Sequence, residues 1–238
     1  MKAMILAAGL GTRLGFVDIP KPMYEIEGKP VLEHNILLLK KHGIKNICIN
    51  LHYLPEVIKD YFQNGKKWDV EIKYSFEKDL LGTSGAVKNV KSFWNDGPFF
   101  VVYGDNFTNI NFTEMFNFHK SCKALATIAL FDPVKVVNSG IAGSYVEMDK
   151  NNRLVSFIEG QGIKKNGYVN AGVYILEPEI LDMIPDNTPS DFGRDIFPKI
   201  LSSGYLINGY LTSSFVFAFD TKDALEATNK HVGNKEKK

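Results

Sequence analysis

The chain has 238 residues, of which 45% are hydrophobic. This length supports one large hydrophobic core or at most two small ones, and we expect a single domain over residues 1–231 followed by a charged flexible tail at 232–238. The 28 basic and 27 acidic residues give a formal net charge of +1. Because so small a charge creates no field for a polyanion, we expect neither nucleic acid nor a membrane surface among its partners.

Cysteine and histidine usage narrows the chemistry further. The two cysteines, Cys48 and Cys122, indicate reduced thiols rather than a disulfide framework or a metal cluster. The apolar run at the N-terminus is too short to span a membrane and lacks the features of a signal peptide, so we predict a cytoplasmic location. The five histidines form no motif with a serine or cysteine nucleophile, and we expect each on a helix surface or in a loop.

Short apolar runs alternate with amphipathic segments up to residue 103. This alternation predicts right-handed βαβ units and a mostly parallel sheet covered by helices on both faces. In the first helix, Pro30 suits the first helical position and Gly43 suits the exit. The predicted strands cover residues 2–8, 46–51, 70–75 and 99–103, and the predicted helices cover 30–42, 54–63 and 83–92.

The first predicted strand breaks into the glycine loop Gly9-Leu10-Gly11-Thr12-Arg13, and Lys21 follows an extended Ile-Pro step. Glycines let backbone N–H groups approach an anion and adopt positive φ, while Arg13 offers a planar fork and Lys21 a point charge. Together these residues predict a cradle for a polyphosphate; the alternative is an ordinary strand-to-helix turn. The loop matches neither a P-loop nor a dinucleotide fingerprint, in which a third glycine would replace Leu14.

Two aspartates end predicted strands. Asp105 follows the apolar run that ends at Gly104, and Asp220 follows the run 215–219. Carboxylate oxygens, with phosphates and waters, are the ligands that Mg²⁺ prefers, and the sequence has no His/Cys cluster with zinc spacing. We therefore predict Mg²⁺ bound by Asp105 and Asp220 beside the glycine loop. The alternative for each aspartate is a strand-end turn or a helix cap.

Beyond Asp105 the pattern changes to shorter strands. A half built of βαβ units followed by a strand-richer half predicts an α/β, Rossmann-like fold with a mixed, mostly parallel sheet flanked by helices, in which the second part binds an acceptor. Ligands bind such sheets at the carboxyl ends of the strands. The predicted strands cover 124–131, 143–149, 154–159, 168–176, 206–211 and 215–220, and the predicted helices cover 113–121, 178–184, 194–203 and 222–230.

The pattern L-A-A-G-L-G-T-R-L, followed by P-K-P-M, resembles the signature loop of the sugar-1-phosphate nucleotidyltransferases, which are nucleotide-sugar pyrophosphorylases. Within that family the chain is most similar to mannose-1-phosphate and heptose-1-phosphate guanylyltransferases. Further motifs recur in the family's order over nearly the whole chain. They are Gly82-Thr83-Ser84-Gly85-Ala86, Val102-Tyr103-Gly104-Asp105-Asn106, Phe157-Ile158-Glu159, Val169-Asn170-Ala171-Gly172-Val173-Tyr174 and Phe192-Gly193-Arg194-Asp195-Ile196-Phe197-Pro198.

The resemblance implies roles for these residues. Arg13, Lys21 and Asp105 would be catalytic, and the two aspartates would hold Mg²⁺ on the α-phosphate. Many members read D-I-G-T at the second aspartate, whereas this chain reads Phe219-Asp220-Thr221-Lys222. Taken alone, the segment 82–85 is typical of a helix cap with Thr83 or Ser84 as the capping residue. The implied nucleotide-binding residues are Leu6, Ala7, Ala8, Gly9, Gly11, Thr12, Leu81, Gly82 and Thr83.

Glu159 and Asn170 are candidates for binding the sugar, because a carboxylate and a two-faced amide suit neighbouring hydroxyls. In the family this glutamate is normally followed by a lysine that meets the sugar phosphate, whereas Gly160 follows it here. Lys164 or Lys165 is a candidate replacement; the alternative is that both are solvated surface. Gly140 resembles the glycine whose backbone approaches the sugar in relatives; the alternative is a plain turn glycine.

The predicted reaction is attack by the phosphate of a sugar 1-phosphate on the α-phosphorus of a nucleoside triphosphate, with release of pyrophosphate. The resemblance favours GTP and a manno- or heptose-type sugar, for surface-polysaccharide precursors. One alternative is a cytidylyltransferase acting on phosphocholine or another alcohol phosphate, and another is an inactive nucleotide-sugar-binding regulator. The sequence leaves open whether the chain forms a homo-oligomer.

Overall fold

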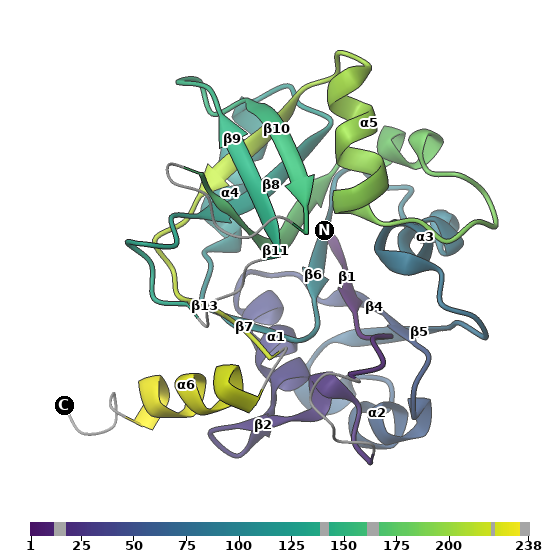
Figure 1. Ribbon diagram of the computed structural model, residues 1–238. Helices are drawn as coiled ribbons and strands as arrows, with labels where there is room; N and C mark the ends of the chain where they lie inside the picture. Colours follow the sequence, from purple (N-terminus) through teal and green to yellow (C-terminus); the bar gives the residue numbers. More distant parts are fainter. Residues whose placement is uncertain (12–17, 139–142, 161–166, 220–221, 234–238) are drawn as a thin grey trace.

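A seven-stranded sheet runs through the middle of the protein (Figure 1). The computed structural model describes residues 1–11, 18–138, 143–160, 167–219 and 222–233. Strand β11 is antiparallel to both of its neighbours, and every other pairing in this sheet is parallel, which confirms the predicted mixed, mostly parallel sheet. The strand order is β12 (Ile207–Leu211), β8 (Ala126–Phe131), β11 (Val169–Leu176), β6 (Phe99–Tyr103), β1 (Lys2–Leu6), β4 (Asn46–Leu51) and β5 (Glu71–Phe76).

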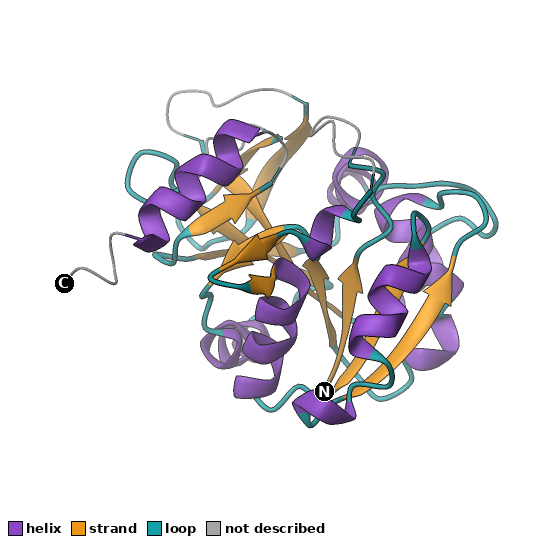
Figure 2. Cartoon of the chain, turned by 90° about the horizontal axis from the view of Figure 1, so that it is seen from below, coloured by secondary structure: helices purple, strands orange, loops and turns teal. Residues whose placement is uncertain are grey.

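Helices cover both faces of the sheet, as predicted (Figure 2). Alternate side chains of a strand point to opposite faces. Ile5 accordingly belongs to the core under α1, α2 and α4, whereas Met4 belongs to the core under α3 and α5. The α-helices among the described residues are α1 (Val31–Lys41), α2 (Pro55–Phe62), α3 (Gly82–Asn89), α4 (Phe112–Ser121), α5 (Phe197–Ser202) and α6 (Lys222–Gly233).

Helix α1 shows how closely local sequence sets the element boundaries. Pro30 is the N-cap residue rather than the first helical residue, because its ψ of 143° is extended rather than helical. The helix therefore begins one residue later than predicted, at Val31. Gly43 leaves the helix with a φ of 76°, a conformation in which a side chain would be strained. Ile36 and Leu39 are fully buried and hold the helix on the sheet.

The strand-richer second half departs from one continuous sheet. Strands β8, β11 and β12 join the main sheet, but β9 (Ser144–Met148) pairs with β10 (Leu154–Glu159), and β13 (Val216–Ala218) pairs with β7 (Asn106–Thr108), in separate antiparallel sheets. The segment expected as a helix at 178–184 is a 3₁₀ helix, and the helix expected at 194–203 begins with a π turn before α5. The remaining short elements are β2 (Glu25–Ile26), β3 (Lys29–Pro30), η2 (Lys21–Met23), η3 (Lys66–Trp68), η4 (Lys91–Phe93), η5 (Pro178–Met183) and η6 (Phe192–Ile196).

Both cysteines are free thiols, as expected. Cys48 is 2% exposed, and burial raises its pKa to about 12, so the thiol stays neutral and behaves as a small apolar side chain. Cys122 is partly exposed. None of the helices in the described ranges has the length and apolar character needed to cross a membrane.

His119 corrects the expectation that every histidine lies on a helix surface or in a loop. It is 3% exposed at the end of α4. Its Nε2 lies 3.1 Å from a carboxylate oxygen of Glu177, which can only accept, so Nε2 carries the proton and the Thr127 hydroxyl donates to Nδ1 at 2.8 Å. Burial lowers the pKa of His119, although Glu177 opposes that shift. The neutral imidazole is therefore the form that the fold holds.

This burial predicts a pH dependence of stability. The histidine of the unfolded chain, with an ordinary pKa of 6.5, takes up a proton before the folded one does, so the contribution of His119 is present above pH 6.5 and is lost as the pH falls further. We expect the free energy of unfolding to fall more steeply for the wild type than for His119→Asn as the pH is lowered. Urea titrations between about pH 7.5 and about pH 5, which lie on either side of an ordinary histidine pKa, measure this difference. Equal slopes for the two proteins would contradict it.

Candidate active site

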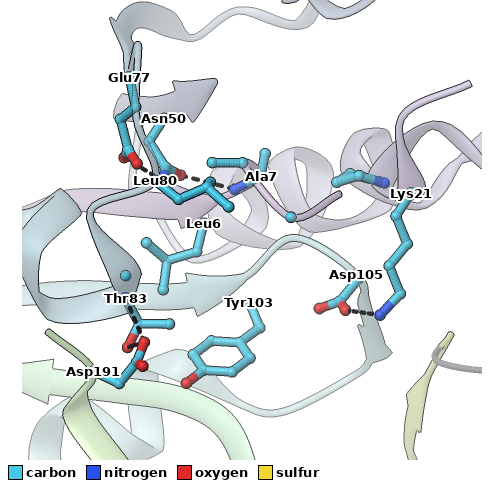
Figure 3. Close-up of a pocket in the computed structure, with 14 residues that line it drawn as sticks. Leu6, Ala7, Lys21, Asn50, Glu77, Leu80, Thr83, Tyr103, Asp105 and Asp191 are labelled. Atoms are coloured by element: carbon cyan, nitrogen blue, oxygen red, sulfur yellow. Dashed lines mark hydrogen bonds and ion pairs between the residues drawn. The ribbon is translucent and has the colours of Figure 1, made fainter. Parts of the chain in front are cut away.

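A cavity of about 290 Å³ opens at the carboxyl ends of the parallel strands β1, β4, β5 and β6 (Figure 3). The glycine loop after β1 and Asp105 after β6 both line it, which confirms that they face one crevice. Its charged side chains lie in separate groups, with Lys21 beside Asp105, Glu77 beside Asn50, and Asp191 beside Thr83. The described residues that line the cavity are Leu6, Ala7, Ala8, Gly9, Lys21, Pro22, Asn50, Glu77, Leu80, Gly82, Thr83, Tyr103, Asp105 and Asp191.

The glycine loop presents backbone donors to this cavity. The N–H of Ala7 donates to Asn50 Oδ1 at 2.8 Å, whereas those of Ala8, Gly9 and Gly11 donate to no other residue in the described ranges. Gly11 has a φ of 64°, as predicted, but Gly9 has no positive φ, and a Cβ there would meet nothing within 4 Å. The protein alone therefore does not require a glycine at position 9. Thr12 and Arg13 lie outside the described residues.

Lys21 and Asp105 form an ion pair on the floor of the cavity. Their side chains are 10% and 23% exposed, so the pair is partly shielded from water. The sequence predicted Lys21 on phosphates and Asp105 on Mg²⁺, two separate partners. The structure brings these two residues together, and each neutralises the charge of the other.

The backbone around Asp105 is fixed by close approach to β1. Gly104 donates its N–H to the carbonyl of Leu6 at 2.9 Å, and a Cβ at Gly104 would lie 2.7 Å from that oxygen, so no side chain fits. On its other side, the carbonyl of Asp105 accepts from the N–H of Phe219 at 3.3 Å, which continues the β7–β13 pairing. Asp220, the next residue, lies outside the described residues.

The start of α3 differs from the helix cap predicted for this segment. The N-cap residue is Leu81, not Thr83 or Ser84. The N–H groups of Ser84 and Gly85 donate to the carbonyl of Ser190, and that of Thr83 donates to Asp191 Oδ1 at 2.9 Å. These amides are therefore already used within the protein. Gly82 and Thr83 line the cavity, whereas Leu81 does not and Leu80 takes that place.

Asn50, Glu77 and Asp191 are cavity residues that sequence reasoning missed. Asn50 lies near the end of β4 and Glu77 directly follows β5, so the rule that parallel strands end at the ligand edge could have indicated both. Asp191 lies in a loop before η6, and no local pattern marks it. Its second carboxylate oxygen pairs with Arg194 at 2.9 Å.

Two of the predicted sugar residues, Glu159 and Asn170, are described, and neither is in the cavity lining. Glu159 is an exposed residue, yet its carboxylate end is covered by Gly193, and this burial, with the nearby charge of Asp191, raises its pKa. Asn170 accepts from Gly172 N–H at 2.9 Å and donates to Tyr174 Oη at 2.7 Å.

Asn170 nevertheless connects to the cavity. The Tyr174 hydroxyl donates to Tyr103 Oη at 3.1 Å, and Tyr103 lines the cavity. The side-chain oxygen and the side-chain NH₂ group of Asn170 each keep one further hydrogen-bonding position. The other predicted sugar residues, Gly140, Lys164 and Lys165, lie outside the described residues.

The fold is that of a nucleotidyltransferase. Residues 2–215 match the family described as nucleotidyl transferase, and the chain belongs to that family. The cavity lining includes Gly9, Lys21 and Asp105, three residues to which the sequence resemblance assigned roles.

Curated relatives include sugar-1-phosphate nucleotidyltransferases. The chain is 37% identical over 228 residues to a UTP–glucose-1-phosphate uridylyltransferase of Synechocystis, covering 87% of this chain and 58% of that protein. It is 40% identical over 185 residues to the D-glycero-α-D-manno-heptose 1-phosphate guanylyltransferase of Campylobacter jejuni, covering 76% and 78%. It is 32% identical over 238 residues to a mannose-1-phosphate guanylyltransferase catalytic subunit beta of Dictyostelium discoideum, covering 98% and 65%. The chain thus spans less than two thirds of the length of two of these relatives.

Solved structures share the whole fold. HddC from Yersinia pseudotuberculosis, crystallised with GMP-PN, superposes with a TM-score of 0.78 at 27% identity, covering 97% of this chain and 99% of that one. A putative glucose-1-phosphate thymidylyltransferase from Bacillus anthracis gives 0.82 at 20% identity, covering 97% and 94%. The second likeness bears on the fold alone.

Gly82 offers a test of the packing between α3 and the loop that carries Asp191. Its φ is 72°, and a Cβ would lie 2.8 Å from the carbonyl carbon of Ser190 and 3.0 Å from Asp191 Oδ1. We expect Gly82→Ala to lower the free energy of unfolding by about 2 kcal/mol or more, because strain and overlap add.

Gly28 supplies the matched control. Its φ is 70°, but a Cβ there meets nothing within 4 Å, so Gly28→Ala measures strain alone. We expect a loss of about 1 kcal/mol for that variant in the same denaturant titration. Equal losses for the two variants would show that the predicted overlap is absent.

Proposed function

We propose that the chain catalyses nucleotidyl transfer to a sugar 1-phosphate. A phosphate oxygen of the sugar 1-phosphate forms a bond to the α-phosphorus, the bond from that phosphorus to the bridging oxygen breaks, and pyrophosphate leaves with the electron pair. The observation that carries the proposal is one cavity lined by Ala8 and Gly9, whose amides have no partner among the described residues, and by the Lys21–Asp105 pair. The nucleophile is already ionised at neutral pH, so positioning and charge neutralisation are the chemistry the protein must supply.

The chain's own residues divide that work. The N–H groups of Ala8, Gly9 and Gly11 would donate to the triphosphate, and Lys21 would place its ammonium between phosphates. Arg13, four residues after Gly9, is the second proposed cation for the developing charge.

A Mg²⁺ site at this position fits the donor chemistry. Asp105 offers hard carboxylate oxygens. The N–H of Phe219 donates to the backbone carbonyl of Asp105, and Asp220 follows Phe219 directly in the sequence. We propose these two aspartates as the protein ligands, which matches the few carboxylates that Mg²⁺ takes beside phosphates and water. The ion would supply positive charge that holds the two anionic substrates together.

Lys21 must then change partner. Lys21 Nζ pairs with Asp105 Oδ2, so the ammonium and a metal ion would compete for this carboxylate until the ammonium moves to the triphosphate. Nucleotide and metal would bind with positive coupling for this reason, because each withdraws one half of the ion pair.

This exchange can be measured without turnover. We expect Lys21→Met to bind Mn²⁺ about tenfold more tightly than the wild type in the absence of nucleotide, since about 1.4 kcal/mol of competition is removed. Calorimetry or Mn²⁺ electron paramagnetic resonance gives the affinity. Lys29→Met, which removes the same charge outside the cavity lining, should match the wild type. Unchanged Mn²⁺ affinity in Lys21→Met would contradict the exchange.

The sequence motifs resemble those of guanylyltransferases, and guanylyltransferases are among the curated relatives. We therefore propose GTP, with a manno- or heptose-type sugar 1-phosphate, for cytoplasmic synthesis of surface-polysaccharide precursors; the named guanylyltransferase relatives support this choice.

The decisive experiment is a pyrophosphate-release screen of nucleoside triphosphates against sugar 1-phosphates, with phosphocholine as a further acceptor. We expect release with GTP and a manno- or heptose-type phosphate. Asp105→Ala and Arg13→Ala should each lower turnover by about three orders of magnitude while the protein remains folded. No release with any pair would refute the enzyme assignment, and near-normal turnover in either variant would remove that residue from the mechanism.

A further inference from the structure

A buried pair of polar side chains, Asn50 and Glu77, joins the two loops that form the cavity (Figure 3). Asn50 is 3% exposed and Glu77 is 2% exposed. Asn50 Nδ2 donates to Glu77 Oε1 at 2.8 Å, Ala7 N–H donates to Asn50 Oδ1 at 2.8 Å, and Leu81 N–H donates to Glu77 Oε2 at 3.0 Å. A chain of three hydrogen bonds thus runs from the glycine loop to the start of α3.

Donor and acceptor chemistry fixes the direction of every bond in this chain. A carboxylate can only accept, so the Asn50 amide must turn its NH₂ toward Glu77 and its oxygen toward Ala7. The backbone of Glu77 is held as well, because its N–H donates to the Leu51 carbonyl at 2.8 Å and its carbonyl lies 2.9 Å from Nδ1 of His52. No other arrangement of these groups satisfies all of the bonds.

The backbone positions that this pair holds adjoin the cavity lining. Ala7 begins the loop whose next amides have no partner among the described residues, and Leu81 lies between two residues of the cavity lining. Reactions that depend on positioning lose rate steeply when donors move by about 1 Å. The pair therefore controls geometry at the phosphate end and at the base end together.

We propose that Asn50 and Glu77 are positioning residues for nucleotidyl transfer, acting through the backbone of Ala7 and Leu81. The proposal rests on the proposed function for its kinetic consequence, but its structural claim concerns the amides of Ala7 and Leu81 and is measured separately. A residue that only stabilised the fold would change the free energy of unfolding and leave kcat alone.

Single substitutions break the chain in a defined way. Asn50→Asp retains the acceptor for Ala7 but sets two carboxylates against each other, and Glu77→Gln leaves one donor facing another, whichever way its amide turns. We expect each to lower kcat by about 10²-fold, with a smaller change in KM for the sugar phosphate. Because the paired carboxylates of Asn50→Asp share a proton at low pH, its kcat relative to the wild type should rise as the pH falls.

The double variant Asn50→Asp/Glu77→Gln is the sharp test. It exchanges the amide and the carboxylate, so the carboxylate now at position 50 accepts from Ala7 and from the amide now at position 77, whose oxygen accepts from Leu81. All three bonds can form again. We expect kcat to recover to within about threefold of the wild type and the protection of the Ala7 and Leu81 amides from hydrogen exchange, measured by NMR, to be restored.

Control experiments distinguish this positioning role from a purely structural role and from failure of the proposed function. Asn208→Asp places a carboxylate at another buried asparagine, 5% exposed on β12 at the far edge of the sheet, and should lower stability with kcat unchanged. A double variant no better than the singles in both kcat and amide protection would overturn the proposal. If the wild type released no pyrophosphate, the proposed function would fail, while amide exchange would still decide whether the pair holds the two loops.

Discussion

The parallel pairing of β1 with both β4 and β6 is the constraint on which the site depends. It makes three strands end at one edge, so the loops that follow them meet although their residues lie far apart in the chain. Gly104 makes this meeting close, because its lack of a side chain lets the end of β6 lie against the carbonyl of Leu6. The carboxylate of Asp105 is placed beside the glycine loop by this contact rather than by the loop itself.

Each charged side chain of the cavity lining has a polar partner among the described residues. Lys21 pairs with Asp105, Asp191 pairs with Arg194, and the carboxylate of Glu77 accepts from an amide side chain and a backbone N–H. A partly buried charge that loses its partner is costly. A ligand that displaces these partners must therefore supply both signs of charge, as we propose for a triphosphate with Mg²⁺.

Much of this arrangement follows from local sequence. Alternating apolar patterns predict the strands of the main sheet, and Gly43 predicts the end of α1, because periodicity and backbone conformation are properties of short segments. The helix cap at Thr83 is wrong because Asp191, more than a hundred residues away, supplies the acceptor instead. Strand β13 lies within the strand predicted at 215–220, whereas its partner β7 has too few residues to show a pattern. His119 is buried because of contacts with Thr127 and Glu177 that its own helix does not reveal.

The antiparallel strand β11 lets the segment before it vary without a change in the parallel strands, which a wholly parallel sheet would not allow. It begins where its neighbours end, so Asn170 reaches the ligand edge from the start of a strand, and Gly172, with a φ of 68°, lets the strand bulge there. Insertions ahead of β11 can thus reshape the acceptor side while β1, β4 and β6 keep their register. Under the proposed function, exchanging that segment would change the sugar specificity and leave the strands that end at the glycine loop as they are.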